Sequence, residues 1–474
     1  MTLFTQEDAK RSIALFCCLY GVGALGMPGN FAMVGYGLGI AIMVLTCAFN
    51  MYASWCMSKV LLIAPKYVKT FGDIGEWSMG IVGRYLANVS QLIVRIVIPI
   101  IFLVLGGSIL CTGVWIVFMA LALLPICLYP TLKEGTGVIF TGAICALVAD
   151  IIALVVLVHN IGLQNDGLLA PSTNLTFDQF ATSASNMGLV FGAGTVIPAL
   201  HREHSDPVRF PRIIIFTYAL ALICSLVMGL VAYSKIGCQV PGGPFGYLVL
   251  VIATPYLGFI SDRGTVIIAM IAMLMHNMIA FTVVIFPSFY ILERRILGRH
   301  PIVIDNSNNY NDLETPEAER AQRKSEARVS IMEPIEFPSH ETAADYNGPG
   351  VYLKVSILRT FVVAVAAALA HIGQRDLEKI ANFAGASMIL LCCLLLPVAF
   401  HAKVFWKNMA TIHKAWAILV FIIGLFVAVE GSILTGKILF RYDKPMPQFP
   451  YCNATYEDYV FTNRTYYMTA VIKH

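Results

Sequence analysis

Long runs of apolar residues, each ended by polar or charged positions, make up most of this 474-residue sequence. A helix needs about 20 residues to cross bilayer hydrocarbon about 30 Å thick, and runs of that length recur along almost the whole chain. The pattern predicts about eleven spanning helices, with a turn at Gly35-Tyr36-Gly37 between the first two. The predicted spans are residues 12–36, 39–63, 85–110, 112–129, 136–158, 184–201, 212–236, 263–290, 353–373, 378–402 and 414–438.

The polar segments between these runs predict the remaining organisation of the chain. A short N-terminal segment, 1–11, precedes the first span, and residues 159–183 form a loop between the fifth and sixth spans. Residues 293–350 are polar, mixed in charge and rich in Glu, Arg, Asn and Pro, so we expect them to be largely disordered. The eleventh span lies within 403–438, and residues 439–474 form a C-terminal tail.

The composition predicts an all-α polytopic membrane protein. With 58% hydrophobic and 13% charged residues and a mean hydropathy of +0.75, the chain is far more apolar than a soluble protein of its length. The net charge of +4 gives no reason to expect a nucleic-acid partner. Cysteines such as Cys17/Cys18 and Cys392/Cys393 lie inside apolar runs without histidines at metal-ligand spacing, so we expect no metal and no cofactor beyond a coupling ion.

The basic residues predict the orientation in the membrane. Thirteen Lys and Arg residues of the short loops fall on one side and four on the other, which places the N-terminus in the cytosol and the C-terminus on the outer or lumenal side. The glycosylation sequons at Asn174, Asn453 and Asn463 all fall on that outer side. Cys238 and Cys452 also lie in outer segments and are a candidate disulfide pair. The pattern fits a plasma membrane and an endolysosomal or vacuolar membrane equally.

Two stretches rich in glycine and proline interrupt the apolar runs. They are Gly21-Val22-Gly23-Ala24-Leu25-Gly26-Met27-Pro28-Gly29-Asn30 in the first span and Gly188-Leu189-Val190-Phe191-Gly192-Ala193-Gly194-Thr195-Val196-Ile197-Pro198 in the sixth. Gly costs about 1 kcal/mol and Pro about 3 kcal/mol relative to Ala inside a helix. The stretches therefore either allow close helix packing or break the helices where backbone lines a cavity.

The positions of the two stretches predict an internal repeat. One opens span one and the other opens span six, as two five-helix repeats over 12–158 and 184–402 would place them. Because five is odd, the second repeat enters the membrane from the opposite side and is inverted. Paired breaks of this kind indicate a transporter site. Exposed N–H groups and carbonyls there match the two charges of an amino acid.

Several motifs, in this order and spacing, resemble the amino acid/auxin permease family. They are Gly21–Pro28, Leu124-Pro125 with Lys133-Glu134-Gly135, Pro198 with His204-Ser205-Asp206-Pro207-Val208-Arg209-Phe210-Pro211, Tyr233–Gly237, and Leu377–Ala386 with Pro397. The resemblance implies an amino acid carrier with a leucine-transporter-like 5+5 inverted repeat, broken helices 1 and 6, and one extra C-terminal helix. The chain departs from the family pattern at Gly29-Asn30, Thr195 and His204, so the substrate and the coupling ion do not follow from the resemblance.

Four ionisable residues inside predicted spans draw attention, because such residues are rare there. One of them, Glu430 in the eleventh span, lies outside the ten-helix repeat and is expected to serve packing or an oligomer contact. Asp150 and His276 are candidates to carry a coupling proton, with a structural hydrogen bond and ordinary packing as the respective alternatives. Arg95 either pairs with Asp150, meets a substrate carboxylate, or extends to the headgroups.

These features together predict a secondary carrier that moves amino acids by alternating access, with proton coupling favoured over sodium coupling. The expected substrate contacts are Gly21, Gly23, Ala24, Leu25, Gly26, Phe191, Gly192, Gly194 and Thr195, with Phe191 as a gate. A sodium-coupled or facilitative carrier remains an alternative, as does a sensor that signals through 293–350. No paired nucleophile and base is seen, so the chain is not expected to be an enzyme. The particular amino acid and the oligomeric state do not follow from the sequence.

Overall fold

The structure is a computed structural model that describes residues 4–298 and 346–458, apart from 66, 67, 69, 110–113, 130–134, 165–171, 203, 243–245, 254–256, 258–262, 347, 375, 376 and 441–446. Within these residues the chain is helical except for one isolated bridge between Ser172 and Cys452. The α-helices are α1 Gln6–Leu19, α2 Val22–Leu25, α3 Met27–Ile63, α4 Phe71–Ile109, α5 Val114–Leu128, α6 Gly135–Gln164, α7 Phe177–Val190, α8 Ile197–Arg202, α9 Phe210–Ile236, α10 Leu248–Ala253, α11 Arg263–Leu297, α13 Val351–Gly373, α14 Leu377–Ala384, α15 Leu396–Phe405 and α16 Thr411–Phe440.

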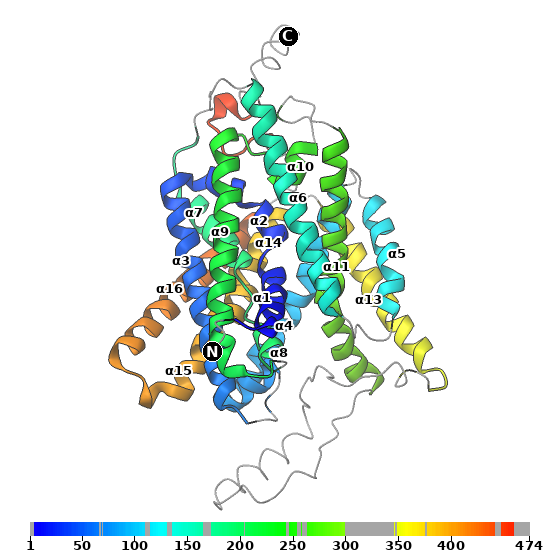
Figure 1. Ribbon diagram of the computed structural model, residues 1–474, viewed down its shortest axis with the longest axis vertical. Coiled ribbons are helices and arrows are strands. Elements are labelled where there is room, and N and C mark those ends of the chain that lie inside the picture. Colours follow the sequence, from blue (N-terminus) through cyan, green and yellow to red (C-terminus); the bar gives the residue numbers. More distant parts are fainter. Residues whose placement is uncertain are drawn as a thin grey trace, which may run out of the picture.

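Eight helical segments of the described residues are long and apolar enough to cross a membrane, which confirms an all-α polytopic architecture. Helix α5, at 15 residues, is shorter, and the first and sixth predicted spans are divided between α1 and α3 and between α7 and α8. The predicted turn between the first two spans lies inside α3, which bends at Gly35. Gly35 has φ 75°, a left-handed conformation that favours glycine. Figure 1 shows α16 on one side of the bundle, with α5 and α13 on the other.

Two predicted boundaries were wrong. Helix α4 starts at Phe71, well before residue 85, and bends at Gly80, where φ is 71°. Helix α7 starts at Phe177, inside the predicted loop 159–183. The Thr176 hydroxyl accepts a hydrogen bond from the N–H of Gln179, whose side chain accepts one from the N–H of Thr176. This capping box starts the helix, and its Thr-x-x-Gln spacing was readable in the sequence.

The tenth predicted span is helical along its length, but part of it is not α-helical. Between α14 and α15 it contains two π-helical segments, η7 Gly385–Ile389 and η8 Leu391–Leu395. Such widened turns occur mostly at functional sites, and these two face the second glycine-rich stretch.

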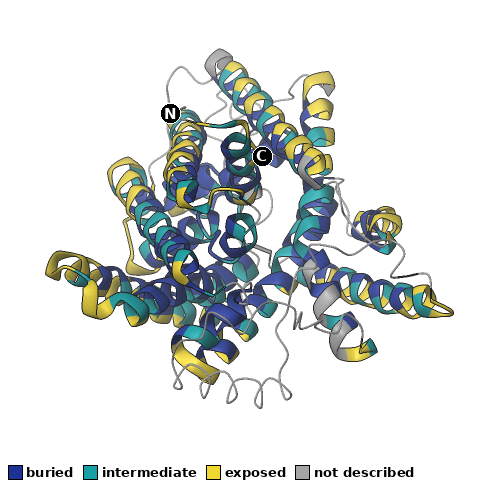
Figure 2. Cartoon of the chain, turned by 60° about the horizontal axis from the view of Figure 1, so that its bottom comes forward, coloured by how far each residue is buried: buried dark blue, intermediate teal, exposed yellow. Residues whose placement is uncertain are grey.

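Buried apolar side chains fill the centre of the bundle, and apolar side chains also cover its outside. The largest buried cluster joins residues of α1, α3, α7 and α9. In Figure 2 the exposed residues lie on the outward faces of the peripheral helices. Large exposed apolar residues such as Phe118, Phe361 and Phe426 belong to α5, α13 and α16. Surfaces this apolar are suited to hydrocarbon rather than to water.

The predicted disordered segment 293–350 was too long at both ends. Helix α11 continues to Leu297, and the fully buried Glu293 accepts a 2.6 Å hydrogen bond from Arg359 Nε of α13. The Arg359 guanidinium lies 5.3 Å from the ring centres of Phe286 and Phe289 and also contacts the Tyr346 hydroxyl. Residues 299–345 lie outside the described residues.

Replacing Arg359 with methionine should destabilise the protein by about 3–5 kcal/mol, because Glu293 would remain buried without its counter-charge. Thermal unfolding of the purified protein in detergent measures the effect. The double variant Glu293→Gln with Arg359→Met should recover most of the loss, because both charges are then gone. A single variant as stable as the original chain would contradict the buried pair.

The segments that the sequence places outside meet at one end of the molecule, shown at the top in Figure 1. Cys238 and Cys452 form a disulfide there. The N–H of Thr173 donates to the carbonyl of Tyr451 at 3.2 Å, so the loop before α7 lies against the tail. Asn174 and Asn453 are both exposed beside this contact, whereas Asn463 lies outside the described residues.

The disulfide should hold two halves of a cut chain together. A protease site inserted within 299–345 would separate Cys238 from Cys452 after cleavage. On a denaturing gel without reductant the halves should stay joined, and reductant or Cys452→Ser should part them. Halves that separate without reductant would show that this pair is not bonded.

Candidate functional site

The first glycine-rich stretch does break its helix. Helix α1 ends at Leu19, and Tyr20 and Gly21 are extended, with φ of −107° and 178°. One short turn, α2, follows, and α3 starts at Met27 with Pro28 in its first turn, where proline leaves no hydrogen bond unmade. The break is therefore shorter than the predicted 21–30, and Gly29 and Asn30 belong to α3.

The second stretch breaks its helix as well. Helix α7 ends at Val190, and α8 starts at Ile197. The Tyr218 hydroxyl of α9 donates a 3.1 Å hydrogen bond to the carbonyl of Phe191, and it lies 2.8 Å from the hydroxyl of Ser54. This tyrosine satisfies a buried carbonyl that the break leaves without a helical partner. A tyrosine inside an apolar span was the only sequence signal for it.

The glycines of both breaks also pack closely against neighbouring helices. Close packing and helix breaking, given as alternatives for these stretches, therefore both occur. A Cβ atom added at Gly23 would lie 2.5 Å from Val190 Cγ2, at the end of α7. A Cβ atom at Gly192 would lie 2.5 Å from Ile389 Cγ2, and one at Gly194 would lie 2.7 Å from the Cα of Cys393. Any larger residue would push the broken helices away from their neighbours.

A cavity of about 60 Å³ lies between the two breaks on the side of the outer segments, with room for several water molecules. It is lined by Gly23, Gly26, Met27, Gly29, Asn30, Met33, Asn186, Leu189, Val190, Val240, Gly246, Tyr247, Ala381, Asn382 and Tyr451. Tyr451 belongs to the segment that the disulfide ties down, so the tail forms part of the cavity wall.

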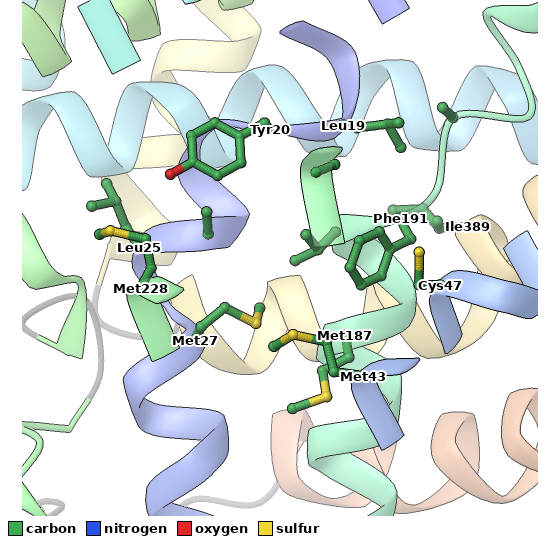
Figure 3. Close-up of a cluster of buried hydrophobic side chains, with 14 of the residues drawn as sticks. Leu19, Tyr20, Leu25, Met27, Met43, Cys47, Met187, Phe191, Met228 and Ile389 are labelled. Carbon is green, nitrogen blue, oxygen red and sulfur yellow. The ribbon is translucent and has the colours of Figure 1, made fainter. Parts of the chain in front are cut away.

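Of the predicted substrate contacts, only Gly23 and Gly26 line this cavity. Gly21, Ala24, Leu25, Gly192, Gly194 and Thr195 lie in the broken segments around it. Phe191 is fully buried, and Figure 3 shows it in an apolar cluster with Met187 and Cys47. In this conformation its side chain is core rather than cavity wall.

Two helix ends of opposite polarity face the cavity. The first turn of α3, which includes Met27 and Gly29, presents N–H groups without helical partners, the positive end of a helix. The last turn of α7 ends at Val190, which also lines the cavity and lies at the negative end of that helix.

Three asparagines that sequence reasoning did not select line the same cavity. They are Asn30 of α3, Asn186 of α7 and Asn382 of α14. The Asn186 side-chain amide donates a 3.1 Å hydrogen bond to the side-chain oxygen of Asn30, which joins the two broken helices. Only the departure of Asn30 from the family pattern drew attention to one of them in the sequence.

Two of the predicted ionisable residues lie next to the first break. Asp150 is fully buried, and the hydroxyl of Tyr20 lies close enough to interact with its carboxyl group. Neither oxygen of Asp150 has a partner at full hydrogen-bond geometry among the described residues. The His276 ring donates from Nδ1 to the carbonyl of Gly142 at 2.9 Å, and its Nε2 lies 2.6 Å from the position of a Cβ atom at Gly21.

Arg95 does not extend to the lipid headgroups. It is 7% exposed, inside the bundle, with the thiol of Cys392 near enough to interact electrostatically. It therefore lies beside the π-helical segment η8 of span ten, which contains Cys392.

The opposite end of the molecule is closed by charged contacts between α1 and the segment before α9. Asp8 lies 2.6 Å from Arg209 Nη2 and accepts a 3.0 Å hydrogen bond from Nε2 of His204. Burial disfavours the Asp8 carboxylate, but the hydrogen bonds from Arg209, Thr5 and His204 outweigh it and hold the pKa of Asp8 below its usual value. His204, a departure from the family pattern, is thus part of this closure.

A bundle of apolar helices with two of them broken around a central cavity defines a polytopic membrane transporter fold. Residues 9–436 match the family described as transmembrane amino acid transporter protein, and the chain belongs to it. The family is one of transporters rather than enzymes, and the predicted resemblance is confirmed.

Individual relatives are distant. The chain is 23% identical to lysine histidine transporter-like 1 of Arabidopsis thaliana over 265 residues, which is 50% of this chain and 58% of that protein. It is also 23% identical to the Arabidopsis thaliana amino acid transporter AVT1I, over 47% of this chain and 57% of the relative. The chain thus aligns with little more than half the length of each.

Two solved structures resemble the chain over most of its length. They are Mhp1, a nucleobase-cation-symport-1 family transporter, with 9% identity, TM-score 0.42 and 95% coverage of both chains, and the Eremococcus coleocola manganese transporter, with 13% identity, TM-score 0.43 and coverage of 93% and 88%.

Valine at Gly23 or Gly192 should lower transport roughly five- to 150-fold, because overpacking by about 1–3 kcal/mol would separate the broken helices from Val190 and Ile389. Uptake into proteoliposomes measures it. Gly137→Val is the control, since a Cβ atom there meets nothing within 4 Å. Normal uptake by the Gly23 and Gly192 variants would rule out this site.

Proposed function

We propose that this protein carries amino acids across a membrane by alternating access, driven by a proton gradient. The observation that carries the proposal is the pair of helix ends at the cavity. The α3 N-terminus suits a carboxylate, and the α7 C-terminus suits an ammonium group, so one free amino acid satisfies both. Membership in the transporter family and the names of the Arabidopsis relatives support the same substrate class.

The arrangement of the two ends of the molecule supports alternating access. The cavity lies on the side of the outer segments, whereas Asp8, His204 and Arg209 close the end that the sequence predicts to be cytosolic. Transport to that side requires these contacts to open while the cavity closes. Helix α1 connects the two events, because Asp8 is near its start and Tyr20 follows its end.

Proton coupling is supported by the position of Asp150. A charged carboxylate is costly to bury without hydrogen-bond partners. Asp150, whose oxygens have none at full geometry among the described residues, is therefore suited to take up and release a proton. Tyr20 connects it to the break, so a change in its charge would act on the segment that holds the substrate. His276, against Gly21, is placed to respond to the same change.

Reconstitution into liposomes tests transport and coupling together. An inward proton gradient should drive accumulation of a labelled amino acid, and a sodium gradient alone should not. Asp150→Asn should abolish accumulation driven by the proton gradient and keep exchange of labelled for unlabelled substrate, because a neutral amide resembles the protonated acid. Glu430→Gln in α16, an acidic residue in the eleventh span, is the control and should behave normally.

Each alternative gives a different result in that experiment. Accumulation driven only by a sodium gradient would contradict proton coupling. Binding without exchange would favour a sensor over a carrier. Neither binding nor uptake of any amino acid would contradict the proposed function itself.

A further inference from the structure

Side-chain amide groups gather around the outer cavity. Asn30, Asn186 and Asn382 come from three different helices and line one small space. Asn30 and Asn382 are buried, at 3% and 8% exposure. Buried amides are costly unless they form hydrogen bonds. The donors and acceptors of these three side chains that have no protein partner therefore indicate which chemical groups a ligand in the cavity should carry.

The first pair fixes its own orientation. Asn30 donates from its amide nitrogen to the carbonyl of Gly26 at 3.3 Å, so its side-chain oxygen faces the other way. That oxygen accepts the hydrogen bond from the nitrogen of Asn186. Asn186 is left with its oxygen and its second N–H for another partner.

Asn382 is the unusual member. Its side chain is more than nine-tenths buried and lines the cavity, and no described residue hydrogen-bonds to its amide. The amide carries two N–H donors and an acceptor oxygen. These groups border the cavity, where a ligand with a matching group can hydrogen-bond to them in place of water.

The cavity also lacks charge. Its described lining contains glycine, alanine, valine, leucine, methionine, asparagine and tyrosine, with no acidic or basic side chain. A cationic or anionic side chain entering it would lose its hydration without gaining a counter-charge. The same cavity is lined by Met27, Gly29 and Val190, where the charged groups of an amino acid would lie, so a side chain would extend toward the asparagines.

We propose that Asn186 and Asn382 bind the side chain of the transported amino acid and select a carboxamide, that of glutamine or asparagine, over charged and apolar side chains. A carboxamide offers both a donor and an acceptor, which matches the free positions of both asparagines. Asn30 is a positioning residue that fixes Asn186. The proposal rests on the transport function above and adds the class of substrate.

Uptake of labelled glutamine and labelled leucine into proteoliposomes tests the proposal. The unaltered protein should prefer glutamine, with unlabelled lysine and glutamate as poor competitors. Asn382→Leu and Asn186→Leu should each raise the glutamine KM about three- to tenfold relative to that of leucine, the size of one lost hydrogen bond. Asn408→Leu, at an exposed asparagine outside the cavity, should leave the ratio unchanged. Asn382→Asp should make lysine a stronger competitor, because it adds a negative charge at the same position.

The controls separate the two proposals. If leucine and glutamine are taken up and their KM ratio is the same in the unaltered protein and both leucine variants, the selection by asparagines is wrong and the transport function stands. If a leucine variant takes up neither glutamine nor leucine, the Asn382→Asp variant provides the test. Lysine that competes with glutamine no better in this variant than in the unaltered protein would overturn the proposal. If the unaltered protein takes up no amino acid, both proposals fail.

Discussion

Backbone hydrogen bonding inside a membrane is the constraint on which this structure depends. A helix that stops in hydrocarbon exposes N–H groups and carbonyls that water cannot reach, so each break must be covered by protein or by a ligand. The Tyr218 hydroxyl donates a hydrogen bond to the carbonyl of Phe191. Close packing at Gly23 and Gly194 shields the neighbouring backbone of the two breaks. The ends of α3 and α7 both contribute to the lining of the cavity, where the proposed substrate would supply the missing hydrogen bonds.

The same constraint explains why the surroundings of the breaks are so specific. Gly385 of η7 packs closely against Ser185 and Leu189 of α7, and span ten widens into π-helical turns where it meets Gly192 and Gly194. Beyond the breaks, one end is closed by Asp8 with Arg209 and the other is bordered by a tail tied to Cys238. A binding site between two such ends can open to one side at a time.

Much of the fold was predictable because hydrophobic runs and glycine-proline clusters are local signals. The positive φ at Gly35 lies in the predicted turn, and both breaks lie within the stretches that the sequence marked. The hydrogen bond between Asn30 and Asn186 joins residues 156 positions apart, and nothing local in either segment indicates it. The π-helical turns were equally hidden, since Gly385–Leu395 reads as an ordinary apolar helix, and the tail reaches the cavity only through a pairing that the sequence left open.

The most direct test of the central claim is an experimental structure of the protein saturated with a transported amino acid. The account predicts the ligand in the cavity between the breaks, with its carboxylate at the N–H groups of Met27 and Gly29 and its ammonium group at the carbonyl of Val190. A ligand bound elsewhere, or held with these two groups reversed, would contradict it.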